Sequence, residues 1–169
     1  MRIVLAFGDT PMMDEGISVV AQPVQTRRQK VLIIEDTQTI VELIRYALQR
    51  FGYTDIIAAY DGIQGLEAFY RERPDCVIVD VRMPGLDGYQ VVRTIRGDTE
   101  TANTPLVILS AYQEPDQRLT GLLSGVDEYL PKPFKPSELA AALDRVMKIT
   151  PEERSQRIED LANDDFPNG

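Results

Sequence analysis

The feature that most constrains the fold of this chain is a repeated alternation, across residues 31–149, of short apolar runs with segments of helical periodicity. The first run, Val31–Ile34, is continuous and rich in β-branched residues, which is typical of a strand buried on both faces of a parallel sheet. Apolar residues then recur at helical spacing from Ile40 to Phe51 and stop at Gly52, which predicts an amphipathic helix. The alternation continues, with predicted strands at 31–34, 56–59, 76–79, 106–109 and 128–130 and predicted helices at 40–51, 62–73, 88–96, 113–124 and from 136 onward.

Five strands that alternate with five helices predict an α/β fold with a doubly wound, five-stranded parallel sheet. Because the crossover connections are right-handed, helices cover both faces of such a sheet. Binding sites in doubly wound sheets lie beyond the carboxyl ends of the strands. The residues that follow each predicted strand are therefore the first candidates for function.

Charge and composition divide the chain into three stretches. Residues 1–30 carry a net charge of +1, and their loose pattern predicts a flexible N-terminal extension. Residues 31–149 carry −6 and form the predicted domain. Residues 150–169 carry −4 and begin with a capping-box pattern at 150–153, which predicts a short acidic helix to about Leu161 in a solvent-exposed tail.

Composition excludes several classes of function. The chain has no histidine, which excludes Ser-His-Asp catalysis and imidazole metal ligands. Its single cysteine, Cys76, excludes an internal disulfide and a cysteine zinc site, and its apolar surroundings predict an inert, buried thiol. The net charge of −9 disfavours binding to nucleic-acid phosphates. No apolar run reaches the roughly 20 residues that span a bilayer and no secretory signal is recognised, so we expect a cytoplasmic protein without membrane insertion.

Polar side chains follow the predicted strands at four places. Glu35 and Asp36 follow the first strand, Asp80 ends the third, Ser110 ends the fourth, and Lys132 follows the fifth. Three carboxylates, one hydroxyl and one ammonium group therefore meet at one edge of the sheet. Clustered carboxylates repel one another and need a cation, and oxygen ligands of this kind suit Mg²⁺.

This set of groups is suited to phosphoryl transfer. A carboxylate beside a metal ion and a lysine can act as a nucleophile and form an acyl phosphate. The transfer needs in-line approach and neutralisation of charge on the phosphoryl oxygens, which Lys132, Ser110 and Mg²⁺ would supply. The absence of histidine from the chain does not hinder this chemistry.

The ordered motifs of residues 31–149 resemble those of the receiver domain of the two-component response-regulator family, which has a flavodoxin-like (βα)5 fold. No single motif is specific, but the set is specific in its order and spacing. The motifs are Ile-Ile-Glu-Asp at 33–36, Val-Ile-Val-Asp-Val-Arg-Met-Pro-Gly-Leu-Asp-Gly at 77–88, Val-Ile-Leu-Ser-Ala at 107–111 and Tyr-Leu-Pro-Lys-Pro-Phe at 129–134.

The resemblance implies a phosphoryl acceptor and a metal site. Asp80 would accept a phosphoryl group from a phosphohistidine on a histidine kinase or histidine phosphotransfer protein. Asp36, Asp80 and the main-chain carbonyl of Arg82 would bind Mg²⁺, with Mn²⁺ as an alternative, and Glu35 would assist through water.

The resemblance also implies a switch. Ser110 and Lys132 would hold the phosphoryl oxygens, and Tyr129 would turn inward as Ser110 moves toward the phosphoryl group. Packing alone is a competing interpretation of Tyr129, because aromatic residues are common in short strands. The Lys132-Pro133 peptide bond is expected to be cis.

These features predict a stand-alone bacterial response regulator that catalyses only its own phosphorylation and dephosphorylation. Its output would be binding to a downstream protein, self-dimerisation or onward transfer in a phosphorelay. One alternative is a Mg²⁺-dependent phosphohydrolase of the haloacid-dehalogenase type, although Arg82 stands where such enzymes carry a second Asp. The other is an interaction module that works without phosphorylation.

Overall fold

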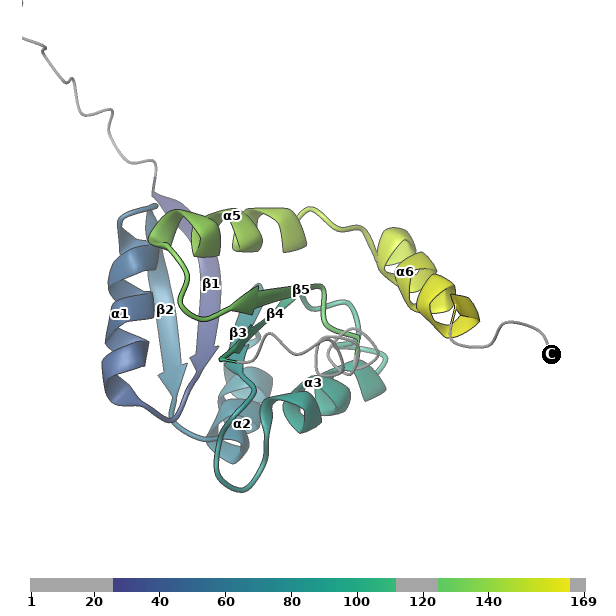
Figure 1. Cartoon of the computed structure of the whole chain (residues 1–169), viewed down its shortest axis with the longest axis horizontal. Helices are drawn as coiled ribbons and strands as arrows, with labels where there is room; N and C mark the ends of the chain where they lie inside the picture. Colours follow the sequence, from purple (N-terminus) through teal and green to yellow (C-terminus); the bar gives the residue numbers. More distant parts are fainter. Residues whose placement is uncertain (1–25, 112–124, 165–169) are drawn as a thin grey trace, which may run out of the picture.

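The computed structural model describes residues 26–111 and 125–164 of the 169-residue chain, so the predicted helix at 113–124 lies outside the described residues. All five strands are parallel and form one sheet in the order β2-β1-β3-β4-β5 (Figure 1). The predicted doubly wound sheet is confirmed. The strands are β1 (Arg27–Ile34), β2 (Tyr53–Ala59), β3 (Cys76–Asp80), β4 (Leu106–Ser110) and β5 (Glu128–Pro131). The helices are α1 (Gln38–Gln49), α2 (Gly62–Glu72), α3 (Gly88–Gly97), α5 (Pro136–Val146) and α6 (Pro151–Asp164).

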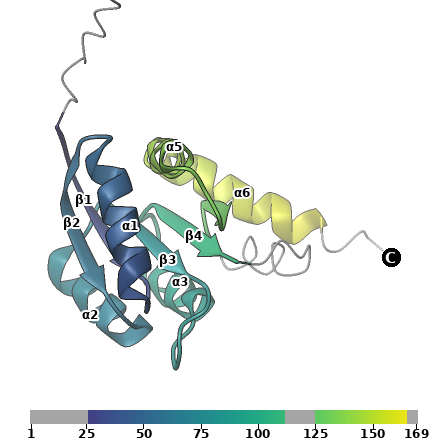
Figure 2. The same ribbon diagram turned by 60° about the vertical axis from the view of Figure 1, so that its left-hand side comes forward.

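The apolar end of β1 lies between two helix layers. Its last four residues have no exposed surface. Val31 and Ile33 pack in one apolar cluster with α1 and α5, whereas Leu32 and Ile34 pack in a second cluster with α2 and α3. Figures 1 and 2 show α5 on the side of the domain opposite to α2 and α3. A continuous apolar run therefore fills both sides of the sheet, as the strand pattern predicts.

Two strands begin earlier than their apolar runs. The structure places the start of β1 at Arg27 and the start of β2 at Tyr53, four and three residues before the predicted starts. The amide of Arg27 donates a hydrogen bond to the carbonyl oxygen of Gly52 at 2.7 Å. The Arg27 guanidinium contacts the Tyr53 hydroxyl at 3.2 Å and forms an ion pair with Asp144 of α5. Polar contacts hold this end of the sheet, and apolar periodicity does not detect them.

Local capping positions the helices that follow β2 and β3. The Asp61 carboxylate accepts a hydrogen bond from the amide of Gln64 at 2.7 Å at the start of α2. Asp87 and Gln90 form a reciprocal capping box at the start of α3, with distances of 2.8 and 2.9 Å. Each cap satisfies amide groups that have no partner within the helix.

Helix α6 begins with the predicted capping box. The Thr150 hydroxyl accepts from the amide of Glu153 at 3.2 Å, and the Glu153 carboxylate accepts from the amide of Thr150 at 2.9 Å. The helix extends to Asp164, three residues beyond the predicted end. The sequence predicts a solvent-exposed tail, with weak docking through Ile158 and Leu161 as the alternative, whereas the structure buries Arg154, whose exposed fraction is 4%. The side chain of Arg154 instead enters the domain.

Cys76, the first residue of β3, has no exposed surface, and burial raises the pKa of its thiol. This confirms the predicted burial, and a raised pKa disfavours the reactive thiolate; the inertness of the thiol stays a prediction. Within residues 26–111 and 125–164, no helix combines the length and the apolar character that crossing a membrane would require.

Gly88 and Gly97, at the two ends of α3, provide a matched test of how closely the helix approaches β3. A Cβ atom at Gly88 would lie 2.2 Å from the carbonyl oxygen of Asp80, whereas a Cβ at Gly97 would meet nothing within 4 Å. We expect Gly88→Ala to lower the free energy of unfolding by about 1–3 kcal/mol, because backbone must move. Gly97→Ala should leave it unchanged or raise it by up to about 1 kcal/mol. Urea denaturation measures both, and equal stabilities would contradict the close approach.

Candidate functional site

Strands β1 and β3 bring three carboxylates together. Ile34 pairs with Val79 in the parallel register, so the residues that follow lie side by side at the carboxyl edge of the sheet. Glu35, Asp36 and Asp80 each offer one carboxylate oxygen, and these oxygens lie within 4.8 Å of one another. Glu35 and Asp80 are buried and Asp36 is exposed. The structure thus assembles the three acids that the strand ends predict.

Lys132 bridges the two buried carboxylates. Its Nζ lies 2.7 Å from Oε2 of Glu35 and 2.7 Å from Oδ1 of Asp80. The amide of Lys132 donates to the carbonyl oxygen of Ser110 at 2.7 Å, which continues the β4–β5 pairing past the end of β5. The Lys132-Pro133 peptide bond is cis, as the resemblance implies. The ammonium group therefore supplies the positive charge that paired carboxylates need.

The electrostatics of Glu35 and Lys132 depend on one another. Burial raises the pKa of Glu35, and the nearby charge of Asp80 adds to this, while the hydrogen bond from Lys132 opposes it. Burial would lower the pKa of Lys132, but its hydrogen bonds to Asp80 and Glu35 outweigh this effect and raise it. Lys132 is therefore held in its charged form at neutral pH.

Main-chain amides complete the carboxylate contacts. The amide of Arg82 donates to Oδ2 of Asp80 at 2.8 Å, and the amide of Thr37 donates to Oε1 of Glu35 at 3.1 Å. Both carboxylate oxygens of Asp80 are therefore engaged, one by Lys132 and one by Arg82. Sequence reasoning missed Thr37, whose only signal was its position between the Glu35-Asp36 pair and the predicted helix at 40–51. The role of the Arg82 carbonyl as a metal ligand stays a prediction.

The two predicted switch residues, Ser110 and Tyr129, differ in burial and in their distance along the strands from the carboxyl edge. Ser110 ends β4 with an exposed fraction of 1%, and it lies one residue beyond Leu109, which pairs with Asp80. Tyr129 pairs with Ile108, further from this edge, and is partly buried against the apolar cluster of α2 and α3. Ser110 thus lies at the carboxyl edge of the sheet, whereas Tyr129 lies within β5 at the level of Ile108, further from that edge. Their roles in switching stay predictions.

The donor set at this edge fits a small, hard divalent cation. Three carboxylate oxygens form the cluster, and the exposed side chain of Asp36 leaves it open to solvent. Mg²⁺ is bound in proteins by one or two carboxylates while it keeps several waters or phosphate oxygens. A carboxylate so placed beside a cation and Lys132 can accept a phosphoryl group.

Comparison with known proteins gives consistent results. Residues 31–144 match the family model described as the response regulator receiver domain. The chain is 40% identical over 123 residues to probable transcriptional regulator ycf27 of Guillardia theta, covering 73% of this chain and 47% of that protein. It is 35% identical over 133 residues to the response regulator MprA of Mycobacterium ulcerans, covering 79% and 56%.

A solved structure agrees with these matches. The receiver domain of the sensor histidine kinase PA1611 from Pseudomonas aeruginosa has a TM-score of 0.65 and 34% identity, covering 70% of this chain and 97% of that one. That structure has a magnesium ion coordinated in its active-site cleft. The chain spans about half the length of the curated relatives that it matches.

Removal of the Lys132 ammonium should make stability depend more strongly on pH. In Lys132→Met, Glu35 and Asp80 lose their shared cation, so the pKa of Glu35 should rise further above its ordinary 4.5. The folded protein then keeps a proton that the unfolded chain releases, so stability is lost as pH rises from that ordinary value through the folded pKa. At pH 8 we expect a loss of about 2–3 kcal/mol, less than for a fully buried pair.

Urea denaturation between pH 5 and pH 8 measures this change. Lys135→Met is the matched control, because Lys135 is exposed three residues further along the chain. The control should follow the wild-type pH profile. A Lys132→Met profile parallel to that of the wild type would contradict the proposed charge balance.

Proposed function

This chain belongs to the response regulator receiver domain family, and on that premise we propose that Asp80 is the phosphoryl acceptor of a phosphorylation-controlled signalling switch. The observation that carries this proposal is the contact of the Lys132 ammonium with Asp80 and Glu35, beside the exposed carboxylate of Asp36. The contact keeps the buried Asp80 carboxylate close to a positive charge. The same charge would stabilise the phosphoryl oxygens once the group is transferred.

The phosphoryl group comes from a donor outside this chain. A histidine kinase or histidine phosphotransfer protein is the proposed donor class, because the chain belongs to the receiver domain family. In the transfer, the bond from phosphorus to the donor imidazole nitrogen breaks as a bond from phosphorus to an Asp80 carboxylate oxygen forms. Lys132 and Ser110 would contact the phosphoryl oxygens. Support comes from the 2.7 Å contact of Lys132 with Asp80 and from the position of Ser110 at the end of β4. A small acyl phosphate is the alternative donor.

Asp36, Asp80 and the main-chain carbonyl of Arg82 would hold Mg²⁺, with Glu35 assisting through water and Mn²⁺ as a substitute. Such an ion would neutralise charge on the phosphoryl oxygens. Support comes from the three clustered carboxylates and from the magnesium ion in the Pseudomonas receiver domain.

Phosphorylation would shift an equilibrium between two conformations in which Ser110 and Tyr129 take part. The altered surface would bind a downstream protein or a second copy of the chain. We propose no catalysis beyond the protein's own phosphorylation and dephosphorylation. The haloacid-dehalogenase alternative is not supported, and Arg82 occupies the position of the second Asp that such enzymes use.

The experiment is phosphorylation with acetyl phosphate and Mg²⁺, followed by intact mass measurement. The wild type should gain the mass of one phosphoryl group, and Asp80→Asn should gain none. Asp55→Asn is the control, because Asp55 is an exposed residue of β2, and it should behave like the wild type. Omission of Mg²⁺ should prevent the gain. Modification of Asp80→Asn, or steady turnover of phosphate monoesters by the wild type, would overturn the proposal.

A further inference from the structure

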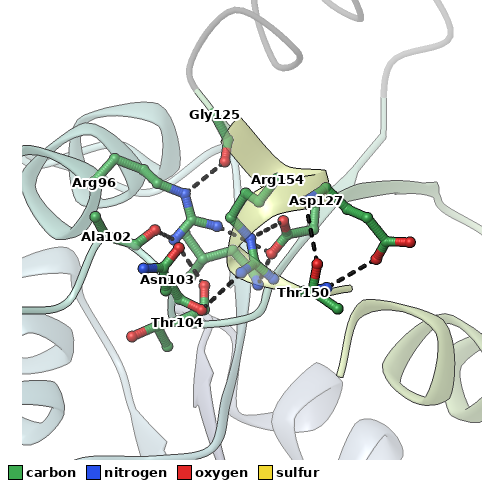
Figure 3. Close-up of polar contacts among 10 residues, drawn as sticks. Arg96, Ala102, Asn103, Thr104, Gly125, Asp127, Thr150 and Arg154 are labelled. Carbon is green, nitrogen blue, oxygen red and sulfur yellow. Dashed lines mark hydrogen bonds and ion pairs between the residues drawn. The ribbon is translucent and has the colours of Figure 1, made fainter. Parts of the chain in front are cut away.

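Helix α6 lies beyond the residues that match the family model, and a buried arginine joins it to the domain. Arg154 is the buried residue among those of α6 whose side chains are described. Its Nε donates to Oδ1 of Asp127 at 2.5 Å, and its Nη1 donates to the carbonyl oxygen of Asn103 at 2.9 Å (Figure 3). Figure 1 shows α6 at the end of the molecule opposite to α1.

The groups that receive Arg154 form a built site, which we call the Arg154 socket and define as Arg96, Asn103 and Asp127. Asp127 is the centre of the socket, with a side chain only 2% exposed. Its Oδ2 accepts from Arg96 at 3.0 Å and from the amide of Leu106 at 2.8 Å. Arg96 also donates to three carbonyl oxygens, those of Gly125 at 2.6 Å, Ala102 at 2.9 Å and Thr104 at 2.7 Å (Figure 3).

Arg154 is one of several partners of Asp127, and the hydrogen bonds of Arg154 itself are incomplete. Asp127 also accepts from Arg96 and from the amide of Leu106, so its carboxylate would keep these two donors if α6 were released. With Arg154 docked, two buried guanidinium groups share one carboxylate, and Nη2 of Arg154 is buried with no hydrogen-bond partner among the described residues. A buried donor without a partner and an excess positive charge both oppose docking. Both features reduce the net free energy that docking of Arg154 contributes.

The Arg154 socket and the candidate active site lie at opposite ends of the same two strands. Leu106 begins β4 and Ser110 ends it. Asp127 directly precedes β5, and the chain continues from β5 to Lys132. Leu106 also belongs to the apolar cluster against which Tyr129 packs. A change in the packing of Tyr129 or the position of β4 would therefore reach the socket through one continuous packed layer.

We propose that Arg154 is a releasable latch: it holds α6 against the domain in the unphosphorylated protein, and phosphorylation at Asp80 releases it. This inference rests on the proposed function, because it concerns the regulation of the same site. Coupling between two sites is reciprocal, so a ligand at Asp80 that weakens docking must itself bind more tightly when α6 is free. Arg154 is a positioning residue in this scheme and takes no part in the chemistry.

Hydrogen exchange of the α6 amides in the full chain tests the latch. Arg154→Ala should raise exchange within 155–164 by about tenfold or more, because an undocked helix of 14 residues is marginal in water. Arg154→Lys should give an intermediate rate, since an ammonium group cannot reproduce the two-nitrogen contact. Arg157→Ala is the matched control, because Arg157 is exposed on the same helix and should leave exchange unchanged. Equal exchange in Arg154→Ala and the wild type would overturn the latch.

Beryllofluoride with Mg²⁺, a stable mimic of the phosphoryl group, tests the coupling. In the wild type it should raise α6 exchange toward the rate of Arg154→Ala, and in Asp80→Asn it should have no effect. By reciprocity, Arg154→Ala should bind beryllofluoride more tightly than the wild type, and Arg157→Ala should not.

The two proposals fail differently. Absence of any Asp80-dependent binding of beryllofluoride, together with absence of phosphorylation by acetyl phosphate, would overturn the proposed function and the coupling with it. Normal binding at Asp80 with unchanged α6 exchange and equal affinities in the wild type and Arg154→Ala would overturn the coupling alone.

Discussion

The Lys132 ammonium lies between two buried carboxylates, and the geometry of the whole edge depends on that contact. Without it, Glu35 and Asp80 would face one another as like charges with little solvent to separate them. The parallel sheet brings the carboxylates together, because β1 and β3 are neighbours and end at the same edge. Lys132 follows β5, which is separated from β1 by β3 and β4, so the contact also ties the outer part of the sheet to its centre.

The ionic clusters around Lys132 and around Asp127 have opposite imbalances. At the carboxyl ends of the strands, three carboxylates meet one lysine, and the cluster suits an added cation. Toward the amino ends of β4 and β5, two arginines meet one carboxylate, and the spare nitrogen of Arg154 faces no acceptor among the described residues. The charges of the carboxylate cluster balance better when a cation is added, and those of the Asp127 cluster balance better when one arginine leaves. Such imbalances favour a change between two conformations.

Much of the fold and the site follows from local patterns in the sequence. The run Val31–Ile34 predicts its burial on both faces, and the rule about strand ends leads directly to Glu35, Asp80 and Lys132. What could not be predicted is held by polar contacts between residues far apart in the chain. Arg27 and Asp144 are 117 positions apart, and Arg154 and Asp127 are 27 apart. Such pairs leave no periodicity, and an arginine in a charged helix gives no sign that it is buried.

The complete burial of Cys76 has a practical consequence. It is the only thiol in the chain, and it lies at the start of β3 with no exposed surface. A thiol reagent can reach it only after the sheet opens, so the labelling rate is the intrinsic rate multiplied by the fraction of open molecules. The labelling rate of Cys76 therefore reports how often the sheet opens, and the measurement needs no substitution in the chain. The labelling rate can therefore be compared among metal-free, metal-bound and phosphorylated samples of an otherwise unaltered chain.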